Sequence, residues 1–294
     1  MKFAAFNVQG ASRVAVVDES RHEARFIEPF CDDMALLIGR SSRDLAELSL
    51  GSPVPLADLT FAPPLRPARN IFCVGKNYRE HAREFNQSGF DSTSAGAAAD
   101  VDKFAAIFTK PPTSLLGHRE LINSHSDVTS QLDYEAELAV VIGKSGKRIS
   151  RAHALDYVWG YSIINDVTAR DLPRDHRQWF MGKSLDTFCP MGPWVTTADE
   201  VGNGDFTVKC WVNDELRQNA STRDLIFDIP SLIETLSAGI GLRPGDIIAT
   251  GTPAGVGIGF KPPRFLKVGD RVDIEISGLG RLENGVGPVS GAKP

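Results

Sequence analysis

Most hydrophobic residues of this chain lie in short runs, and Gly, Pro, Asn or Asp residues stand at the ends of these runs. Short runs rich in Val, Ile, Phe and Tyr are typical of β-strands. Residues 207–212 and 215–218 flank Asn213-Asp214 in the way that two strands flank a hairpin turn. The remaining strands are expected at 2–7, 13–17, 24–27, 71–74, 134–142, 159–166, 246–250, 271–276 and 281–286.

Helical spacing of hydrophobic residues is rarer. It occurs from residue 32 or 33 to about 48 and again at 231–237. Strands and helices do not alternate regularly, which argues against a doubly wound sheet. The pattern therefore predicts an α+β, mostly β protein. We expect a small N-terminal α+β domain at residues 1–68, ending in a proline-rich connector, and a main domain at residues 69–294.

The composition is that of an ordinary globular protein, with 294 residues, 42% of them hydrophobic and 23% charged. A formal net charge of −5 and the lack of a basic cluster argue against nucleic acid or an anionic membrane as a main partner. No apolar stretch approaches the ~20 residues of a membrane span, and polar residues interrupt the N-terminal segment too early for a signal peptide. The scattered cysteines predict reduced, buried thiols in a cytoplasmic protein: Cys31, Cys73, Cys189 and Cys210.

Two acidic residues open the strongly apolar run at 134–142. Glu135 and Glu137 are two residues apart, so on a strand both side chains leave the same face. Their Cα atoms would lie roughly 6–7 Å apart, close enough for one cation to bind both, whereas on a helix the side chains would diverge. Most such pairs are solvated, and this pair alone favours that interpretation. Asp166, at the end of another apolar strand, adds a third carboxylate and suggests an all-oxygen site for Mg²⁺, Mn²⁺ or Ca²⁺.

A candidate base follows the strand at 71–74. Asn77 is a favourable N-cap, and Glu80 has the spacing of its capping-box partner. On the resulting helix, His81 and Glu84 are i, i+3 neighbours, so the carboxylate can orient the imidazole and the pair can activate water. Taken alone, the segment favours an exposed helix of alternating Arg and Glu. The small, polar residues 86–103 that follow predict either a surface loop or a mobile lid over a site.

Two further segments are candidates for binding negative charge. Lys183 lies in an apolar, glycine-containing turn and is either a solvated cation or a charge that stabilises an enolate or a substrate carboxylate. Residues 249–257 leave a predicted strand and resemble a loop whose backbone N–H groups bind an anion. This loop has neither the P-loop nor the dinucleotide-binding spacing, so nucleotide binding is not expected.

Taken together, several stretches of the chain resemble the fumarylacetoacetate hydrolase family. They recur in the family's order from about residue 71 to the C-terminus: VGKNYREHAREF, KPPTSLLG, LDYEAELAVVIG, GYSIINDVTARDL, GKSLDTFCPMGPW and RPGDIIATGTPAGVG. The resemblance implies a mixed, roll-like or barrel-like β-sheet in the main domain, a Mg²⁺ or Mn²⁺ site and a homodimer. By matching position, it implies Glu135, Glu137 and Asp166 as metal ligands, His81 and Glu84 as the general base, Lys183 as the polarising cation, and Thr252 as a substrate contact. Arg170 has either a structural role or a contact with substrate.

The resemblance also implies a reaction. The metal and Lys183 would stabilise an enolate of a 2-oxo acid, and water activated by His81–Glu84 would cleave a C–C bond in an acylpyruvate or related β-diketo acid. Decarboxylation of a 2-oxo acid and isomerisation of a dienol diacid use the same enolate, so both stay open. A metal-stabilised binding protein without activity is a further alternative. Some members have a glutamine where this chain has Pro173, which can donate no hydrogen bond, so the family's type substrate is not assured.

Overall fold

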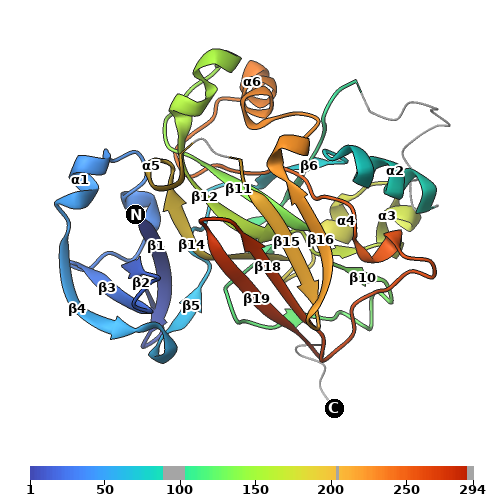
Figure 1. Cartoon of the computed structure of the whole chain (residues 1–294), viewed down its shortest axis with the longest axis horizontal. Coiled ribbons are helices and arrows are strands. Elements are labelled where there is room, and N and C mark those ends of the chain that lie inside the picture. Colours follow the sequence, from blue (N-terminus) through green and yellow to red (C-terminus); the bar gives the residue numbers. More distant parts are fainter. Residues whose placement is uncertain (89–102, 203–204, 290–294) are drawn as a thin grey trace.

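The computed structural model describes residues 1–88, 103–202 and 205–289, and β-strands dominate it (Figure 1). The largest sheet is mixed, and ten of its strands follow one open path, with β5 (Thr60–Ala62) pairing with β1 and β8 (Leu115–Leu116) with β14. The path runs through β4 (Ser49–Pro55), β3 (Glu23–Glu28), β2 (Ala11–Asp18), β1 (Lys2–Val8), β14 (Cys189–Thr197), β12 (Val158–Asn165), β11 (Ala136–Ile142), β17 (Ile247–Ala249), β6 (Ile71–Gly75) and β7 (Ala106–Lys110).

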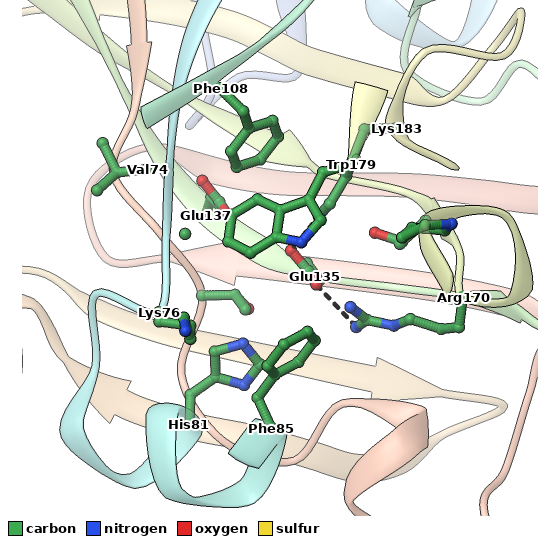
Figure 2. A pocket seen from close by; sticks show the side chains of 14 residues that line it. Val74, Lys76, His81, Phe85, Phe108, Glu135, Glu137, Arg170, Trp179 and Lys183 are labelled. Carbon is green, nitrogen blue, oxygen red and sulfur yellow. Dashed lines mark hydrogen bonds and ion pairs between the residues drawn. The ribbon is translucent and has the colours of Figure 1, made fainter. Parts of the chain in front are cut away.

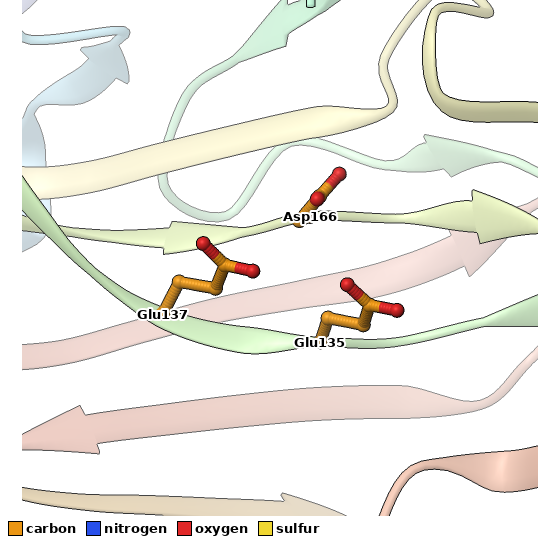
Figure 3. Close-up of side chains that lie close together, drawn as sticks. All are labelled: Glu135, Glu137 and Asp166. Carbon is orange, nitrogen blue, oxygen red and sulfur yellow. The ribbon is translucent and has the colours of Figure 1, made fainter. Parts of the chain in front are cut away.

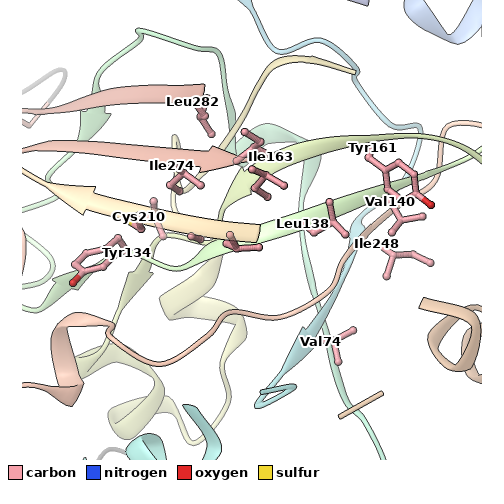
Figure 4. Packing of buried hydrophobic residues seen from close by; sticks show 14 of the residues in the cluster. Val74, Tyr134, Leu138, Val140, Tyr161, Ile163, Cys210, Ile248, Ile274 and Leu282 are labelled. Atoms are coloured by element: carbon pink, nitrogen blue, oxygen red, sulfur yellow. The ribbon is translucent and has the colours of Figure 1, made fainter. Parts of the chain in front are cut away.

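A smaller sheet packs against this one through a shared hydrophobic core. Leu138 and Ile163, from β11 and β12, belong to the same buried cluster as Cys210, Ile274 and Leu282 of the smaller sheet (Figure 4). The smaller sheet contains β16 (Glu215–Ser221), β15 (Thr207–Val212), β18 (Arg271–Ile276), β19 (Gly280–Gly287) and β9 (Ile122–Asn123).

The opposite face of β11 is also buried. Ala139 and Val141 alternate with Leu138 along the strand and lie in a second core, which includes Phe3 and Val14 from the N-terminal strands. Because side chains alternate along a strand, Glu135 and Glu137 lie in line with Ala139 and Val141. The two acids therefore continue a buried face and are not on a solvated one.

The α-helices of the described residues are mostly short: α1 (Ser42–Ala46), α2 (Arg79–Ser88), α3 (Asp171–His176), α4 (Phe180–Lys183), α5 (Ala198–Val201) and α6 (Ile229–Gly239). Among the described residues, none of these helices has the length and apolar character needed to cross a membrane. Figure 1 shows α2, α3 and α4 close together on one side of the main sheet.

The mostly β fold and its strand pattern are confirmed. The predicted hairpin pairs β15 with β16, and its two turn residues, Asn213 and Asp214, have φ of +50° and +68°, as expected of a tight hairpin turn. The predicted long helix at 32–48 is wrong. The chain forms a 3₁₀ turn at Met34–Leu36, passes through Gly39 with φ +88°, and starts α1 only after a capping box at Ser41.

The N-terminal residues are joined closely to the rest of the chain. β1 pairs with β14 in an antiparallel register, with Lys2 opposite Thr196, so the N-terminal strands extend the main sheet (Figure 1). The proline-rich segment is not only a connector, because Pro53 and Pro55 belong to β4, an edge strand where a missing N–H is tolerated. A division at residue 68 into two domains stays a prediction.

The four cysteines are buried and unpaired, as predicted. Most of the predicted lid at 86–103 lies outside the described residues, and its first residues belong to the end of α2.

Candidate metal and catalytic site

Three carboxylates from two neighbouring strands meet at one end of the main sheet. Glu135 directly precedes β11, Glu137 is its second residue, and Asp166 directly follows β12. The pairing of Ala136 with Asn165, and a 2.8 Å hydrogen bond from the Asp166 N–H to the Glu135 carbonyl, align the two strands. One oxygen of each carboxylate lies within 4.8 Å of the others, and all three residues are buried (Figure 3). The structure therefore brings together the predicted metal-binding residues.

Each carboxylate has one oxygen held by another group of the chain. The Lys110 ammonium donates to Asp166 Oδ1 at 2.6 Å, and Arg170 forms a 2.7 Å ion pair with Glu135 Oε1. The backbone N–H of Gly251 donates to Glu137 Oε2 at 2.8 Å. These contacts leave Asp166 Oδ2, Glu135 Oε2 and Glu137 Oε1 for the interior of the cluster.

Lys183, the last residue of α4, reaches into this interior. Its Nζ donates to Glu135 Oε2 at 2.6 Å and to Asp166 Oδ2 at 2.8 Å. Burial alone would lower the pKa of Lys183, but the charges of Asp166 and Glu135 raise it above its usual value. The lysine therefore stays a cation and acts as a donor.

The electrostatics of the cluster fit a further cation. Burial, together with the charges of Asp166 and Glu135, raises the pKa of Glu137 well above its usual value. Burial would also raise the pKa of Glu135, but Lys183, Arg170 and His81 lower it to about 2. Because negative charge is costly at Glu137, a cation among the three oxygens would be stabilised there. An all-carboxylate donor set suits a hard divalent ion such as Mg²⁺ or Mn²⁺.

The predicted His–Glu pair is present beside the cluster. On α2, His81 Nδ1 lies 3.2 Å from Glu84 Oε2, and only 3% of His81 is exposed. The N–H of Gly255 donates to Glu84 Oε1 at 3.0 Å and so fixes the carboxylate from the other side. Figure 2 shows His81 and Glu135 in the same pocket, contributed by α2 and the β11 segment.

The prediction that Asn77 caps this helix is wrong. Its side-chain amide is buried, donates to the carbonyls of Phe227 and Thr250, and accepts the N–H of Phe227. Asn77 thus connects the start of α2 with two distant segments, and α2 begins at Arg79. Hydrogen bonds between residues so far apart in the sequence leave no local sequence pattern that would predict them.

One pocket joins these groups, with a volume of about 490 Å³ that includes its open mouth. Its apolar wall contains Phe85 and Phe108, which each lie edge to face against the ring of Trp179. Lys76, Arg170 and Lys183 add positive charge to the lining. The pocket therefore combines a shielded apolar wall with groups that suit a small anion. Its complete lining is Val74, Gly75, Lys76, His81, Phe85, Phe108, Glu135, Glu137, Thr168, Arg170, Pro173, Trp179, Lys183 and Thr252.

Arg170 also contacts the carboxylate of Asp133, at 2.9 Å from its Nε. Asp133 in turn accepts the N–H groups of Gly257 and Ile258. Arg170 thus links Asp133 to Glu135, which gives it a structural role even though it lines the pocket.

The predicted anion-binding loop does bind anions, but they belong to the chain itself. Its N–H groups contact Glu137, Glu84 and Asp133, from Gly251, Gly255 and Gly257 respectively. Thr252, in the same loop, lines the pocket and accepts a 2.8 Å hydrogen bond from Gln218. The loop therefore orients both the metal-binding cluster and the His–Glu pair.

The sequence analysis assigned no role to Lys110, Gln218 or Asp133. Lys110 is fully buried at the end of β7. A lysine that ends an apolar run was the available signal, because a buried lysine needs a charged partner. Gln218 had no comparable signal, since its partners lie 34, 35 and 82 residues away. Pro173 lines the pocket, so the departure noted at that position does lie at the site.

The fold and the site define a β-rich protein with a buried carboxylate cluster beside a His–Glu pair. A family model described as fumarylacetoacetate (FAA) hydrolase C-terminal matches residues 70–287. The chain therefore belongs to the fumarylacetoacetate hydrolase family, whose members are enzymes, and the family prediction is confirmed.

Its relatives differ in the reactions that their names describe. Oxaloacetate tautomerase YisK of Bacillus subtilis is 50% identical over 251 residues, covering 85% of this chain and 77% of the relative. The structure of a fumarylacetoacetate hydrolase from Exiguobacterium antarcticum has a TM-score of 0.83 at 41% identity and covers 98% of this chain and 99% of its own. A 2-hydroxyhepta-2,4-diene-1,7-dioate isomerase from Mycobacterium marinum has a TM-score of 0.75 at 32% identity, over 100% of both chains.

Proposed function

We propose that this protein is a divalent-metal-dependent enzyme that forms an enolate from a short 2-oxo acid, and that its reaction is the keto–enol tautomerisation of an oxaloacetate-like dicarboxylate. The observation that carries the proposal is that Glu135, Glu137, Lys183 and His81 line one pocket. Asp166 completes the carboxylate cluster behind Lys183, and Glu84 contacts His81. The relative named oxaloacetate tautomerase, 50% identical to this chain, supports the choice of reaction.

The proposed cofactor is Mg²⁺ or Mn²⁺, held by Glu135, Glu137 and Asp166. One oxygen of each carboxylate contacts Arg170, Gly251 or Lys110. Each residue then has one further oxygen for the ion, and a bound ion would share those of Glu135 and Asp166 with Lys183 or displace its ammonium from them. Three single-oxygen ligands suit the octahedral geometry of Mg²⁺, which keeps several other positions for water and substrate. Ca²⁺ takes more oxygens and often binds both oxygens of one carboxylate, so it fits less well.

Each protein group has a distinct part in the proposed reaction. His81, oriented by Glu84, removes a proton from the carbon next to the keto group; the C–H electron pair forms a C=C bond, and the carbonyl π pair moves to oxygen. Water protonates that oxygen, and His81 returns its proton to solvent. The Lys183 ammonium would stabilise the negative oxygen, and a bound divalent cation would supply further positive charge there.

Hydrolysis of a C–C bond in an acylpyruvate is the second candidate. The His81–Glu84 pair favours it, because an oriented imidazole can also activate water, and the relative from Exiguobacterium antarcticum is named as a hydrolase. Decarboxylation and dienol-diacid isomerisation use the same enolate and remain further candidates. A binding protein without activity would have no use for the His–Glu pair, so we place it last.

A substrate panel with and without EDTA tests the proposal. Oxaloacetate tautomerisation, followed by the ultraviolet absorbance of the enol, should require Mg²⁺ or Mn²⁺ and exceed turnover of acylpyruvates and of a dienol diacid. Replacement His81→Asn should lower the rate about 10²-fold or more, the usual contribution of a general base, while Mn²⁺ affinity stays within about twofold. Unchanged tautomerisation in the presence of EDTA, or in His81→Asn, would contradict the proposal, and faster acylpyruvate cleavage would favour the hydrolase.

The proposal includes a homodimer in a reducing cytoplasm. The dimer is what the resemblance implies, and the four buried, unpaired cysteines fit a reducing compartment. Sedimentation equilibrium tests the dimer, and a mass equal to one chain would contradict it.

A further inference from the structure

Gln218 is a buried amide that connects the loop containing Thr252 to the strand segment that carries Glu135 and Glu137. It lies on β16 and is 1% exposed. Its Oε1 accepts the N–H of Ala136 at 3.1 Å, and its Nε2 donates to the Pro253 carbonyl at 2.7 Å and to Thr252 Oγ1 at 2.8 Å. All the hydrogen-bonding atoms of this side chain are thereby used.

The backbone fixes which end of the amide faces Thr252. The Ala136 N–H can only donate, and the Pro253 carbonyl can only accept. The opposite amide orientation would place two donors against each other and two acceptors against each other. The amide nitrogen therefore faces Thr252, and this assignment does not depend on the threonine hydroxyl itself.

This orientation decides what the Thr252 hydroxyl can do. Its oxygen accepts from Gln218, so its single proton is available for a different acceptor. Within residues 1–88, 103–202 and 205–289, no protein group accepts that proton. Thr252 is 2% exposed and lines the pocket, so the pocket is the remaining place for an acceptor.

We infer that Gln218 is a positioning residue, which holds the Thr252 hydroxyl as a hydrogen-bond donor to the carboxylate of a ligand in the pocket. The assignment of that ligand as a 2-oxo acid rests on the proposed function. Ala136, whose N–H Gln218 accepts, lies between Glu135 and Glu137. One amide therefore sets the position of the Thr252 donor relative to the carboxylate cluster.

Oxalate binding tests this inference without requiring turnover, because oxalate is an unreactive mimic of the 2-oxo acid end. In Gln218→Glu, the oxygen that replaces Nε2 can accept the Thr252 proton and turn it away from the pocket. In the presence of Mg²⁺, calorimetry should show oxalate binding weakened about tenfold, the effect of losing one hydrogen bond to a charged group. Thr252→Val should weaken binding to a similar extent, and the double variant should be no weaker than Thr252→Val alone.

The matched control is Asn219→Asp, which makes the same charge change one residue along β16 on its exposed side. Oxalate affinity should not change in this control. If Gln218→Glu does not fold, Gln218→Met is used in its place, because it removes the orienting donor. It should weaken oxalate binding in the wild-type background but not in the Thr252→Val background.

The inference is overturned if substitution of Gln218 leaves oxalate affinity unchanged. It is also overturned if the substitution weakens oxalate binding equally in the wild-type background and in the Thr252→Val background. Failure of the wild-type protein to bind oxalate also overturns it. A wild-type protein that binds oxalate with this dependence, yet turns over no substrate of the panel, contradicts only the proposed function.

Discussion

At the scale of single residues, the contacts of Lys110 bear on the choice of metal. Its ammonium holds one oxygen of Asp166 and leaves the other for the cluster. In Lys110→Met, Asp166 Oδ1 is released as a further ligand, which Ca²⁺ can use more readily than Mg²⁺ can. We expect the ratio of Ca²⁺ to Mg²⁺ affinity, measured by calorimetry, to rise about tenfold or more. An unchanged ratio would contradict the proposal that each carboxylate offers a single oxygen to the metal ion.

Gly259 tests the role of Glu84. A Cβ at position 259 would lie 1.7 Å from Glu84 Oε1, so Gly259→Ala must displace the carboxylate that orients His81. Turnover should fall about 10²-fold, as for loss of a general base, with Mn²⁺ affinity kept. Gly239→Ala is the control, because no heavy atom lies within 4 Å of its added Cβ. Normal turnover in a folded Gly259→Ala protein would remove Glu84 from the mechanism.

The sequence predicted the site residues unequally, for a physical reason. Glu135 and Glu137 were found because the period of a strand places both on one face, and His81 with Glu84 because helical spacing makes them neighbours. Lys110 and Asp166 are 56 residues apart, and their 2.6 Å contact depends on how β7 lies across the sheet. No local pattern contains that information.

At the scale of elements, His118 joins β5 and β19. Its Nδ1 accepts the N–H of Glu283, and its ring lies edge to face against Phe61, with ring centroids 4.7 Å apart. Burial, and then the charge of Arg119, lower the pKa of His118 to about 3. The buried ring is therefore neutral at pH 7.

A stability profile follows from this shift. Below about pH 6.5 the unfolded chain binds a proton at this histidine that the folded chain does not, so stability falls as the pH falls from 6.5 towards 3. At pH 5 the loss is up to about 2 kcal/mol. In His118→Asn, the difference in unfolding free energy between pH 6.5 and pH 5, measured with urea, should shrink by that amount. The control is His153→Asn, because the His153 side chain is 73% exposed. The same pH dependence of the unfolding free energy in the wild type and in both variants would contradict the prediction.

The elements themselves show where sequence patterns succeed. Strand positions were predicted well, because β18 alternates polar and apolar residues and β11 and β12 are mostly apolar. The helix expected at 32–48 failed because its hydrophobic spacing spans Gly39, where the backbone has a positive φ. Spacing alone does not reveal such a break, although the glycine is a warning.

At the scale of the whole molecule, the N-terminal strands and the main sheet share one core. Phe3 is fully buried and stacks on Trp159, with ring centroids 5.8 Å apart. We expect a single unfolding transition, with tryptophan fluorescence and far-ultraviolet circular dichroism giving the same midpoint.

Phe3→Ala should lower that midpoint without splitting the transition, at a cost of about 3–5 kcal/mol for a buried phenylalanine. Phe30→Ala is the control, because Phe30 is 57% exposed, and it should cost under about 0.5 kcal/mol. Two separate transitions would show that residues 1–68 fold as an independent domain. The sequence pattern could not predict the pairing of β1 with β14, because paired residues such as Phe3 and Val195 are more than 190 positions apart.

The most direct test of the account is a crystal of the protein grown with Mn²⁺ and oxalate, measured for anomalous scattering. One strong manganese peak is expected, bounded by oxygens of Glu135, Glu137 and Asp166, with oxalate on its open side next to the Thr252 hydroxyl. A map with no peak among these three residues, or with manganese bound only elsewhere, would contradict it.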